Sequence, residues 1–271
     1  MLKVRYRCLY NESWSAVPTC RLCHLRDSTT HLLGSCAHPQ IKKEIIIKHN
    51  GGARLLIQAW RLSSPFGGDT LFANVGRSDT LNHLRTCPPW LGLPASYSLN
   101  PDLLIVKGWP QHKADANKFP RTRSEKLAVT LCFLEYKTCN DFGCAAILQD
   151  IYTKYTPVAS AAPADPAATA PNLHLFHALR RLGWRVLGLS LDGSVGTSAQ
   201  HDRMHAVAVG HGALLSSAVT TRIARDVLEL KSAETDELAL ALVRHQAMSA
   251  SRIHSIANNL RRALPPRGAP R

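Results

Sequence analysis

Two short apolar runs, residues 101–106 and 127–134, interrupt the polar sequence in the middle of the chain. Both contain β-branched and other apolar residues, both are short for a helix, and turn-forming residues flank them. Runs of this kind are typical of buried β-strands. The polar stretch PQHKADANKFPRTRSEK between them predicts an exposed, basic loop.

Longer segments on both sides of these runs have helical character. The segment IKKEIIIKHNGGARLLIQAW predicts a helix that is broken near Gly51 and Gly52. The segment NLHLFHALRRLGW predicts another helix, and RVLGLSL after it predicts a strand. A strand, a helix and a further strand in that order indicate an α/β sheet.

The rest of the pattern divides the chain into three parts. Residues 61–98 are rich in Pro, Gly and Ser, which indicates loops, and the chain beyond Ser198 looks helical and ends in a basic tail. At 271 residues the chain is longer than the roughly 100–200 residues of a usual domain. We therefore expect a small module at residues 1–60, a core at 61–198 and a helical extension at 199–271.

The charge of the chain favours a polyanionic partner. Lys and Arg number 33 against 19 Asp and Glu, which gives a formal net charge of +14. Nucleic acid is the first candidate for such a surplus. The alternative is that the basic residues only solvate the surface, because charge alone does not identify a site.

The apolar content excludes a membrane protein. No apolar run approaches the roughly 18 residues of a membrane helix, and MLKVRYRCLYNES lacks the apolar region of a signal peptide. We expect a soluble, intracellular protein without a membrane partner. In that compartment the eight cysteines would be thiols or metal ligands.

Cysteine and histidine are concentrated in one short stretch, TCRLCHLRDSTTHLLGSCAHP. The pattern Cys-x2-Cys-x7-His-x4-Cys is formed by Cys20, Cys23, His31 and Cys36. Three thiolates and an imidazole are the ligands of a tetrahedral structural Zn²⁺ site, with the first pair on a turn. His24 and His38 are rival ligands, and ordinary reduced cysteines beside a chance histidine are the alternative interpretation.

Acidic residues on the two expected strands form a second candidate site. Because strand side chains alternate, Glu135 and Lys137 point to the same face while Tyr136 points to the other. Asp102, at the head of the neighbouring strand, can meet them there. Two carboxylates bind Mg²⁺, which polarises a phosphate and lowers the pKa of a bound water. Lys137 would orient that water or stabilise the charge that develops on the phosphorus centre.

Other short motifs are weaker. Glu229 and Lys231 form a rival Glu-x-Lys, but their surroundings look helical, where side chains two residues apart diverge. The zinc-protease pattern is incomplete in HDRMH, which has Asp in place of Glu. The alternative for the strand acids is a turn-capping Asp102 and a surface pair of Glu135 with Lys137.

The order of these segments carries a family resemblance. The segments are RYRCLYNESW, CRLCHLRDSTTHLLGSCAHP, KHNGGARLL, NPDLLIVKGW, FLEYKTCND and LGWRVLGLSLDGSVG. This order, from about Arg5 to Gly196, resembles the C-terminal region of non-LTR retrotransposon polyproteins that carry a restriction-like endonuclease. Pro-Asp followed by Glu-x-Lys resembles the PD-(D/E)xK signature of those nucleases.

The resemblance implies an α/β, restriction-endonuclease-like core sheet flanked by helices, with an N-terminal zinc-knuckle module. It implies a DNA endonuclease that nicks a chromosomal target in the nucleus, with DNA as partner and the element's RNA as a further candidate. Zinc ligands would be Cys20, Cys23, His31 and Cys36. Asp102 and Glu135 would hold Mg²⁺ or Mn²⁺ beside Lys137. Asp141 and His49 match further motif positions with less defined roles.

Three positions depart from the family pattern. Asn100 stands where Arg is usual, Tyr155 stands near the place of a Gln-His pair, and ASAAPADPAATAP is an unusually long linker. These departures leave open a decayed copy that only binds nucleic acid, and a junction-resolving or repair nuclease of the same fold is a further alternative. Since the chain has no Tyr/Phe-Ala-Asp-Asp core of a reverse transcriptase, we expect a stand-alone or truncated element.

Overall fold

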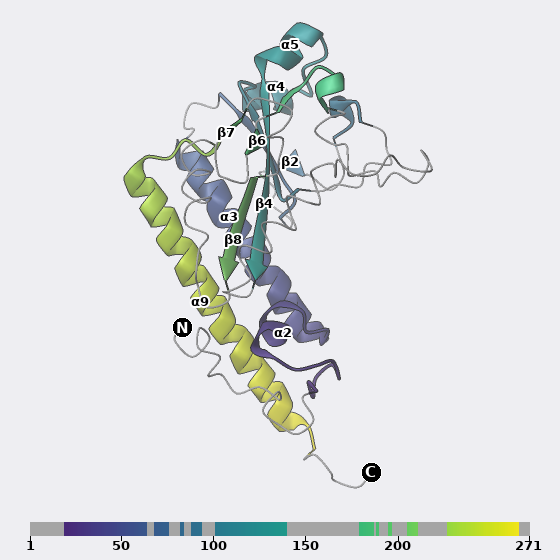
Figure 1. The fold of residues 1–271 in the computed structure, drawn as a ribbon, viewed down its shortest axis with the longest axis vertical. Coiled ribbons are helices and arrows are strands. Elements are labelled where there is room, and N and C mark those ends of the chain that lie inside the picture. Colours follow the sequence, from purple (N-terminus) through teal and green to yellow (C-terminus); the bar gives the residue numbers. More distant parts are fainter. Residues whose placement is uncertain are drawn as a thin grey trace.

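The fold combines one main mixed sheet with two long helices (Figure 1). The computed structural model describes residues 19–63, 68–75, 82–83, 88–93, 101–139, 179–186, 188–189, 195–196, 205–210 and 227–265. The expected combination of helices with a β-sheet is confirmed. Among the described helices, none combines the length and apolarity that crossing a membrane requires.

The main sheet has six strands in the order β2-β1-β3-β4-β5, and β8 also pairs with β4. The strands are β1 (Thr70–Ala73), β2 (Asn82–His83), β3 (Leu103–Lys107), β4 (Thr130–Cys139), β5 (Arg185–Val186) and β8 (His205–Gly210). Strand β3 is antiparallel to both of its neighbours, β1 and β4. Strand β2 is parallel to β1, and β5 and β8 are parallel to β4. A separate two-stranded sheet joins β6 (Gly188–Leu189) to β7 (Val195–Gly196).

Strands β3 and β4 confirm the two strands expected from the apolar runs, and the expected strand after Trp184 is present as β5 and β6. Two expectations about other strands are wrong. Residues 61–98 contain β1 and not only loops. The sequence pattern missed this strand because its four residues are all buried and too few to show a period. The chain beyond Ser198 is not helical throughout, since residues 205–210 form β8 through pairing with distant β4.

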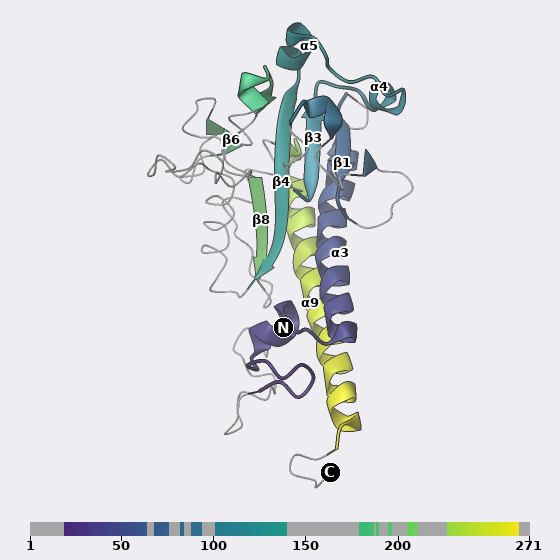
Figure 2. The same cartoon turned by 90° about the vertical axis from the view of Figure 1, so that its right-hand side faces the viewer.

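Two long helices, α3 (Pro39–Ser63) and α9 (Ser232–Ala263), pack on each other and against one face of the sheet (Figure 2). They are antiparallel, because Glu44 binds Arg252 whereas the more C-terminal Gly51 lies against His245. The central core lies between these helices and strands β1, β3 and β4. Apolar burial of this kind contributes about 25 cal/mol per Å² removed from water.

Helix α3 is continuous through Gly51 and Gly52, so the expected break is wrong. The physical reason is a close approach of neighbouring elements. A Cβ on Gly52 would lie 2.1 Å from Cζ of Tyr136, and one on Gly51 would lie 2.3 Å from Cε1 of His245. The two glycines therefore let β4 and α9 approach the helix, and the surrounding packing holds the helix together.

The connection between β3 and β4 is exposed and basic as expected, but it is not a simple loop. It contains α4 (Gln111–Asp115) and α5 (Arg123–Ala128). Thr122 and Glu125 form a capping box at the start of α5, in which each side chain bonds the other residue's backbone N–H. This reciprocal cap starts a helix that the polar composition alone does not suggest.

A second core lies at the other end of the molecule, around α2 (Thr29–Gly34). It combines Cys20 and Cys36 with apolar residues of α2 and α3 and with the C-terminal half of α9. The two cores thus join segments from all three expected parts of the chain. The boundaries at residues 60 and 198 stay predictions.

Candidate metal centres

The four predicted zinc ligands lie together at the N-terminal end of the described chain. Their ligand atoms, from Cys20, Cys23, His31 and Cys36, all lie within 4.8 Å of one another. In a tetrahedral site with Zn–S bonds of about 2.3 Å, ligand atoms are about 3.8 Å apart. Soft thiolates and an imidazole at this spacing form a site that can hold zinc.

The local backbone explains how the first pair of ligands is placed. The N–H of Cys20 donates to the carbonyl of Leu25, and the N–H of His24 donates to the carbonyl of Cys20. His24 adopts the left-handed conformation, with φ of 63°. This tight turn brings Cys20 and Cys23 to one side, as expected for a knuckle.

Helix α2 places His31 as the fourth member of the cluster. Ser28 caps the helix by accepting the N–H of His31, and Nε2 of His31 lies 3.1 Å from Sγ of Cys23. Nδ1 lies 3.4 Å from Oγ of Ser35, which can orient the ring. The rival residues His24 and His38 are not part of the cluster.

The two buried thiols, Cys20 and Cys36, shift each other's pKa in opposite directions. A hydrogen bond with Cys36 lowers the pKa of Cys20 to about 3, although burial opposes this shift. The same hydrogen bond, together with burial, raises the pKa of Cys36. The raised pKa of Cys36 favours its protonated thiol. Zinc ligation would remove that proton, because the ligand is the thiolate.

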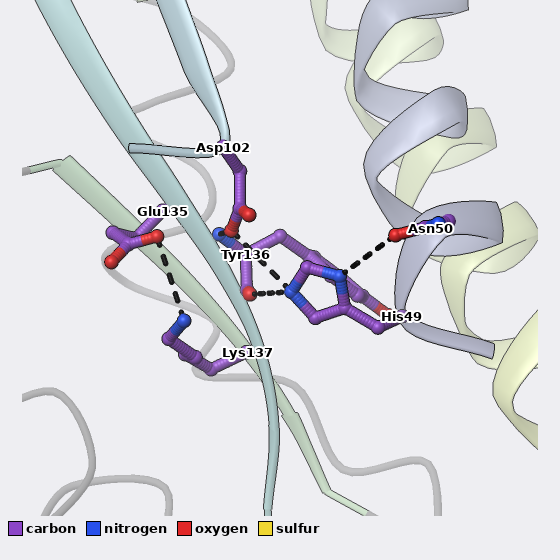
Figure 3. A network of polar contacts seen from close by, with 6 residues as sticks. All are labelled: His49, Asn50, Asp102, Glu135, Tyr136 and Lys137. Atoms are coloured by element: carbon purple, nitrogen blue, oxygen red, sulfur yellow. Dashed lines mark hydrogen bonds and ion pairs between the residues drawn. The ribbon is translucent and has the colours of Figure 1, made fainter. Parts of the chain in front are cut away.

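The second site lies on β4, where side chains alternate as expected (Figure 3). Tyr136 is fully buried in the core beneath α3. Glu135 is only 1% exposed, and its Oε2 lies 3.5 Å from Nζ of Lys137. Glu135 and Lys137 therefore form a pair on one face, and the Lys137 side chain is 36% exposed.

Asp102 immediately precedes β3 and meets β4 at the same level. The register pairs Leu103 with Leu134, so its continuation by one residue sets Asp102 opposite Glu135. Oδ2 of Asp102 accepts the backbone N–H of Tyr136 at 2.8 Å. Asp102 thus lies at the junction of the two strands with its carboxylate turned toward His49, whereas the Glu135–Lys137 pair lies on the other side of the β4 ribbon in Figure 3.

His49 comes from α3 and completes a polar network around Tyr136 (Figure 3). Its Nε2 lies 2.8 Å from the carbonyl oxygen of Tyr136 and 3.4 Å from Oδ2 of Asp102. Since a carbonyl oxygen only accepts, Nε2 carries a proton and donates. Nδ1 lies 3.3 Å from Oδ1 of Asn50.

The charges of His49 and Asp102 stabilise each other. Burial lowers the pKa of His49, but the hydrogen bond and the charge of Asp102 outweigh it, so the net shift is upward. Burial raises the pKa of Asp102, but His49, Lys137 and the N–H of Tyr136 outweigh it, so the net shift is downward. Both groups therefore favour their charged forms.

The remaining predicted positions differ in outcome. Asp141, Asn100 and Tyr155 lie outside the described residues. In the part of the chain that the structure describes, no second group of three or more potential ligands is close enough to hold an ion. The rival Glu229 is not helical as expected but precedes α9 with φ of 58°, and it forms an ion pair with Lys107.

Two features of these sites have no short-range signal in the sequence. One is the contact of His49 with Asp102 and Tyr136, for which only the KHN motif marks a position. The other is a buried ion pair at 3.0 Å between Asp27, beside the zinc cluster, and Arg261 of α9. Both join residues that are far apart in sequence, so local patterns cannot reveal them.

Compared with known proteins, the sequence matches no family model and shows no significant similarity to a curated protein.

Proposed function

We propose that this protein is a metal-dependent DNA endonuclease with a restriction-like fold, in which Asp102, Glu135 and Lys137 carry the reaction. The observation that supports the proposal best is the pairing of β3 with β4, because Asp102 directly precedes β3 and accepts the backbone N–H of Tyr136, the neighbour of Glu135. Lys137 follows two residues later on the same face, 3.5 Å from Glu135. Two acids and a lysine on adjacent strands are the arrangement that the PD-(D/E)xK resemblance implies.

Asp102 and Glu135 would hold Mg²⁺ or Mn²⁺. Such an ion is usually bound by one or two carboxylates together with waters and phosphate oxygens, so two acids suffice. Among the described residues, Tyr136 and His49 both contact Oδ2 of the Asp102 carboxylate, so Oδ1 is the oxygen that we assign to the ion. When bound, the ion would polarise the scissile phosphate and lower the pKa of a water.

Lys137 and His49 have different roles in this proposal. The half-exposed ammonium of Lys137 can contact a phosphate and stabilise the charge that develops on it during attack. His49 is a positioning residue, because it touches Asp102 and the β4 backbone through one nitrogen. Its proton holds the Asp102 carboxylate in the ionised form that a cation requires.

The zinc cluster supports binding of nucleic acid next to this site. Zinc would fix the knuckle through Cys20, Cys23, His31 and Cys36. Lys42 and Lys43 are exposed in the first turns of α3, beside the cluster. Lysines at such a position neutralise phosphates without reading bases.

The resemblance supports a specific substrate, chromosomal DNA that is nicked during integration of a non-LTR retrotransposon, with the element's RNA as a second partner. Nuclear action follows from that substrate. Because DNA is read through phosphates in this proposal, its affinity should fall with salt. The target sequence is not part of the proposal.

A second candidate function is nucleic-acid binding without cleavage. The observation that favours it is the burial of Glu135, which is 1% exposed and already paired with Lys137. A carboxylate that is already paired with a lysine has its charge compensated without a metal ion. In this alternative the zinc module and basic surfaces persist, but the acids no longer bind a metal.

Nicking of supercoiled plasmid by the purified chain tests the proposal. We expect nicking with Mg²⁺ or Mn²⁺, none with EDTA, and a loss of at least about 100-fold in Glu135→Gln, which keeps the size of the side chain but removes the charge. DNA binding in EDTA should stay within about threefold of the wild type, because Glu135 makes no phosphate contact in the proposal.

Glu237→Gln is the matched control, because Glu237 is exposed on α9 and lies outside the site. It should nick like the wild type. Unchanged nicking in Glu135→Gln would overturn the assignment of the site. Salt-dependent binding without any metal-dependent nicking would favour the second candidate.

A further inference from the structure

Helix α5 lies at the end of the sheet where β4 begins, away from α2 and the zinc cluster (Figure 2). Exposed basic residues form a surface there. We call it the α5 patch and define it as Arg121, Arg123, Lys126, Arg181 and Arg185. The first three come from α5 and the turn before it, and the last two flank Trp184. All except the half-buried Lys126 are exposed.

Specific contacts hold the two halves of the α5 patch together. Nζ of Lys126 donates to the carbonyl of Leu182 at 3.2 Å and lies 5.2 Å from the centre of the Trp184 ring. A Cβ on Gly183 would lie 3.8 Å from Cγ of Arg123. Arginines from separate parts of the chain are thus kept close at one end of the fold, although like charges repel.

The carboxylate of Glu125, the acidic residue of α5, is engaged by hydrogen bonds at the start of its own helix. The carboxylate of Glu125 accepts the backbone N–H groups of Arg121 and Thr122, each at 2.9 Å, and the Thr122 hydroxyl at 3.0 Å. These bonds lower the pKa of Glu125 and direct its charge to the start of the helix. The arginine side chains of the α5 patch are exposed and can contact an external anion.

Aromatic residues beneath the α5 patch indicate the form of that anion. Trp184 is 2% exposed, and its ring meets the edge of Trp90 with centroids 5.4 Å apart. Trp90 in turn stacks on Phe119 at 4.9 Å with an interplanar angle of 1°. Single-stranded nucleic acid binds through bases that stack on open rings. The rings of Trp184, Trp90 and Phe119 instead pack on one another. The α5 patch therefore offers positive charge for phosphates and not rings for bases.

The position of the α5 patch relates it to the candidate metal site. Along β4, Glu135 follows Thr130, the residue next to α5, by five positions, and five residues of strand span about 17 Å. This length equals about five base pairs of B-DNA, or half of a helical turn. A duplex that is held at the metal site can therefore reach the α5 patch on one side.

We propose that the α5 patch binds the phosphate backbone of duplex DNA about five base pairs to one side of the scissile phosphate. This inference rests on the proposed endonuclease function. It adds a second anchor for the DNA, beyond the zinc module, and sets the direction in which the duplex crosses β4. Two anchors on opposite sides of the metal site would fix the position of the cut.

The test is the salt dependence of binding to a fluorescent 30-base-pair duplex in EDTA, where no cleavage occurs. The variant combines Arg123→Gln, Arg181→Gln and Arg185→Gln. Each lost phosphate contact lowers the slope of log K against log salt by about 0.9, so we expect a decrease of about 2.7. The control combines Arg54→Gln, Arg61→Gln and Arg244→Gln on exposed faces of α3 and α9, and it should keep the slope of the wild type.

The outcomes separate this inference from the proposed function. Circular dichroism and the melting temperature verify that the variants fold. The proposed role of the α5 patch would be overturned by an unchanged slope in the α5 variant, or by equal decreases of the slope in the α5 and control variants. This holds even if the wild type nicks DNA. A loss confined to single-stranded DNA or to RNA of the same length would also overturn it. A reduced duplex slope in a protein that never nicks would support binding of duplex DNA by the α5 patch, but it would overturn both the placement beside a scissile phosphate and the proposed nuclease function.

Discussion

At the scale of single residues, the peptide group of Tyr136 is the centre of the candidate nuclease site. Its N–H donates to Asp102, and its carbonyl accepts from His49. The residues on either side of it are Glu135 and Lys137, which form their own ion pair. Asp102 and His49 therefore hold the backbone that carries Glu135 and Lys137. The position of Glu135 thus depends on Asp102.

The pKa of His49 should reveal this network in metal-free protein. Burial alone lowers the pKa of His49, and the upward shift comes from the hydrogen bond and charge of Asp102. We therefore expect a pKa above 6.5 in the wild type and below 6.5 in Asp102→Asn, where burial remains and the charge is absent. NMR titration of the histidine ring protons in EDTA measures both values.

The same shift has a consequence for stability. A histidine whose pKa is raised on folding stabilises the folded state at pH values below its unfolded pKa of about 6.5, and the contribution is lost as pH rises through the folded value. Asp102, whose pKa is lowered, remains ionised throughout that window. A pKa of His49 that is the same in wild type and Asp102→Asn would contradict the described contact.

At the scale of elements, the approach of α3 to β4 depends on Gly52. A Cβ at this position would lie 2.1 Å from the Tyr136 ring, which is fully buried and cannot move aside. We expect Gly52→Ala to destabilise the fold by about 1–3 kcal/mol through overpacking, although alanine favours helices. Chemical unfolding followed by circular dichroism measures this difference.

Gly68→Ala is the matched control for Gly52→Ala. A Cβ on Gly68 has no atom within 4 Å, so its effect should stay within about 0.5 kcal/mol. If Gly52→Ala were as stable as the wild type, α3 and β4 would not be in the described contact. Loss of stability in Gly68→Ala alone would equally contradict the packing.

The same elements show what the sequence can predict. The cluster of candidate zinc ligands follows from spacing, and β3 and β4 follow from their apolar runs, because both signals lie within a few residues. The alternation on β4 also predicts that Glu135 and Lys137 share a face. In contrast, the continuity of α3 at Gly52 depends on Tyr136, and β8 depends on β4. Such long-range packing overrides local propensity, so a local pattern cannot predict it.

At the scale of the whole molecule, helix α9 connects the two cores. Its N-terminal half packs in the central core with Leu238 and Leu242, and its C-terminal half packs around the zinc cluster with Ala250, Ile253 and Ala257. The buried pair of Asp27 with Arg261 adds a polar contact at the far end. The stability of half of this helix should therefore depend on zinc.

Removal of zinc should consequently release one end of the molecule and leave the other folded. Binding of a structural zinc contributes to folding free energy, and buried thiols without an ion lose that contribution. After treatment with a zinc chelator, we expect amide protection from hydrogen exchange to fall in residues 20–41 and 250–261 and to persist in β3 and β4. Cys36→Ala should show the same pattern without chelator, whereas Cys132→Ala, whose thiol lies in the central core, should not. Uniform loss of protection, or none, would show that α9 does not connect two cores of separate stability.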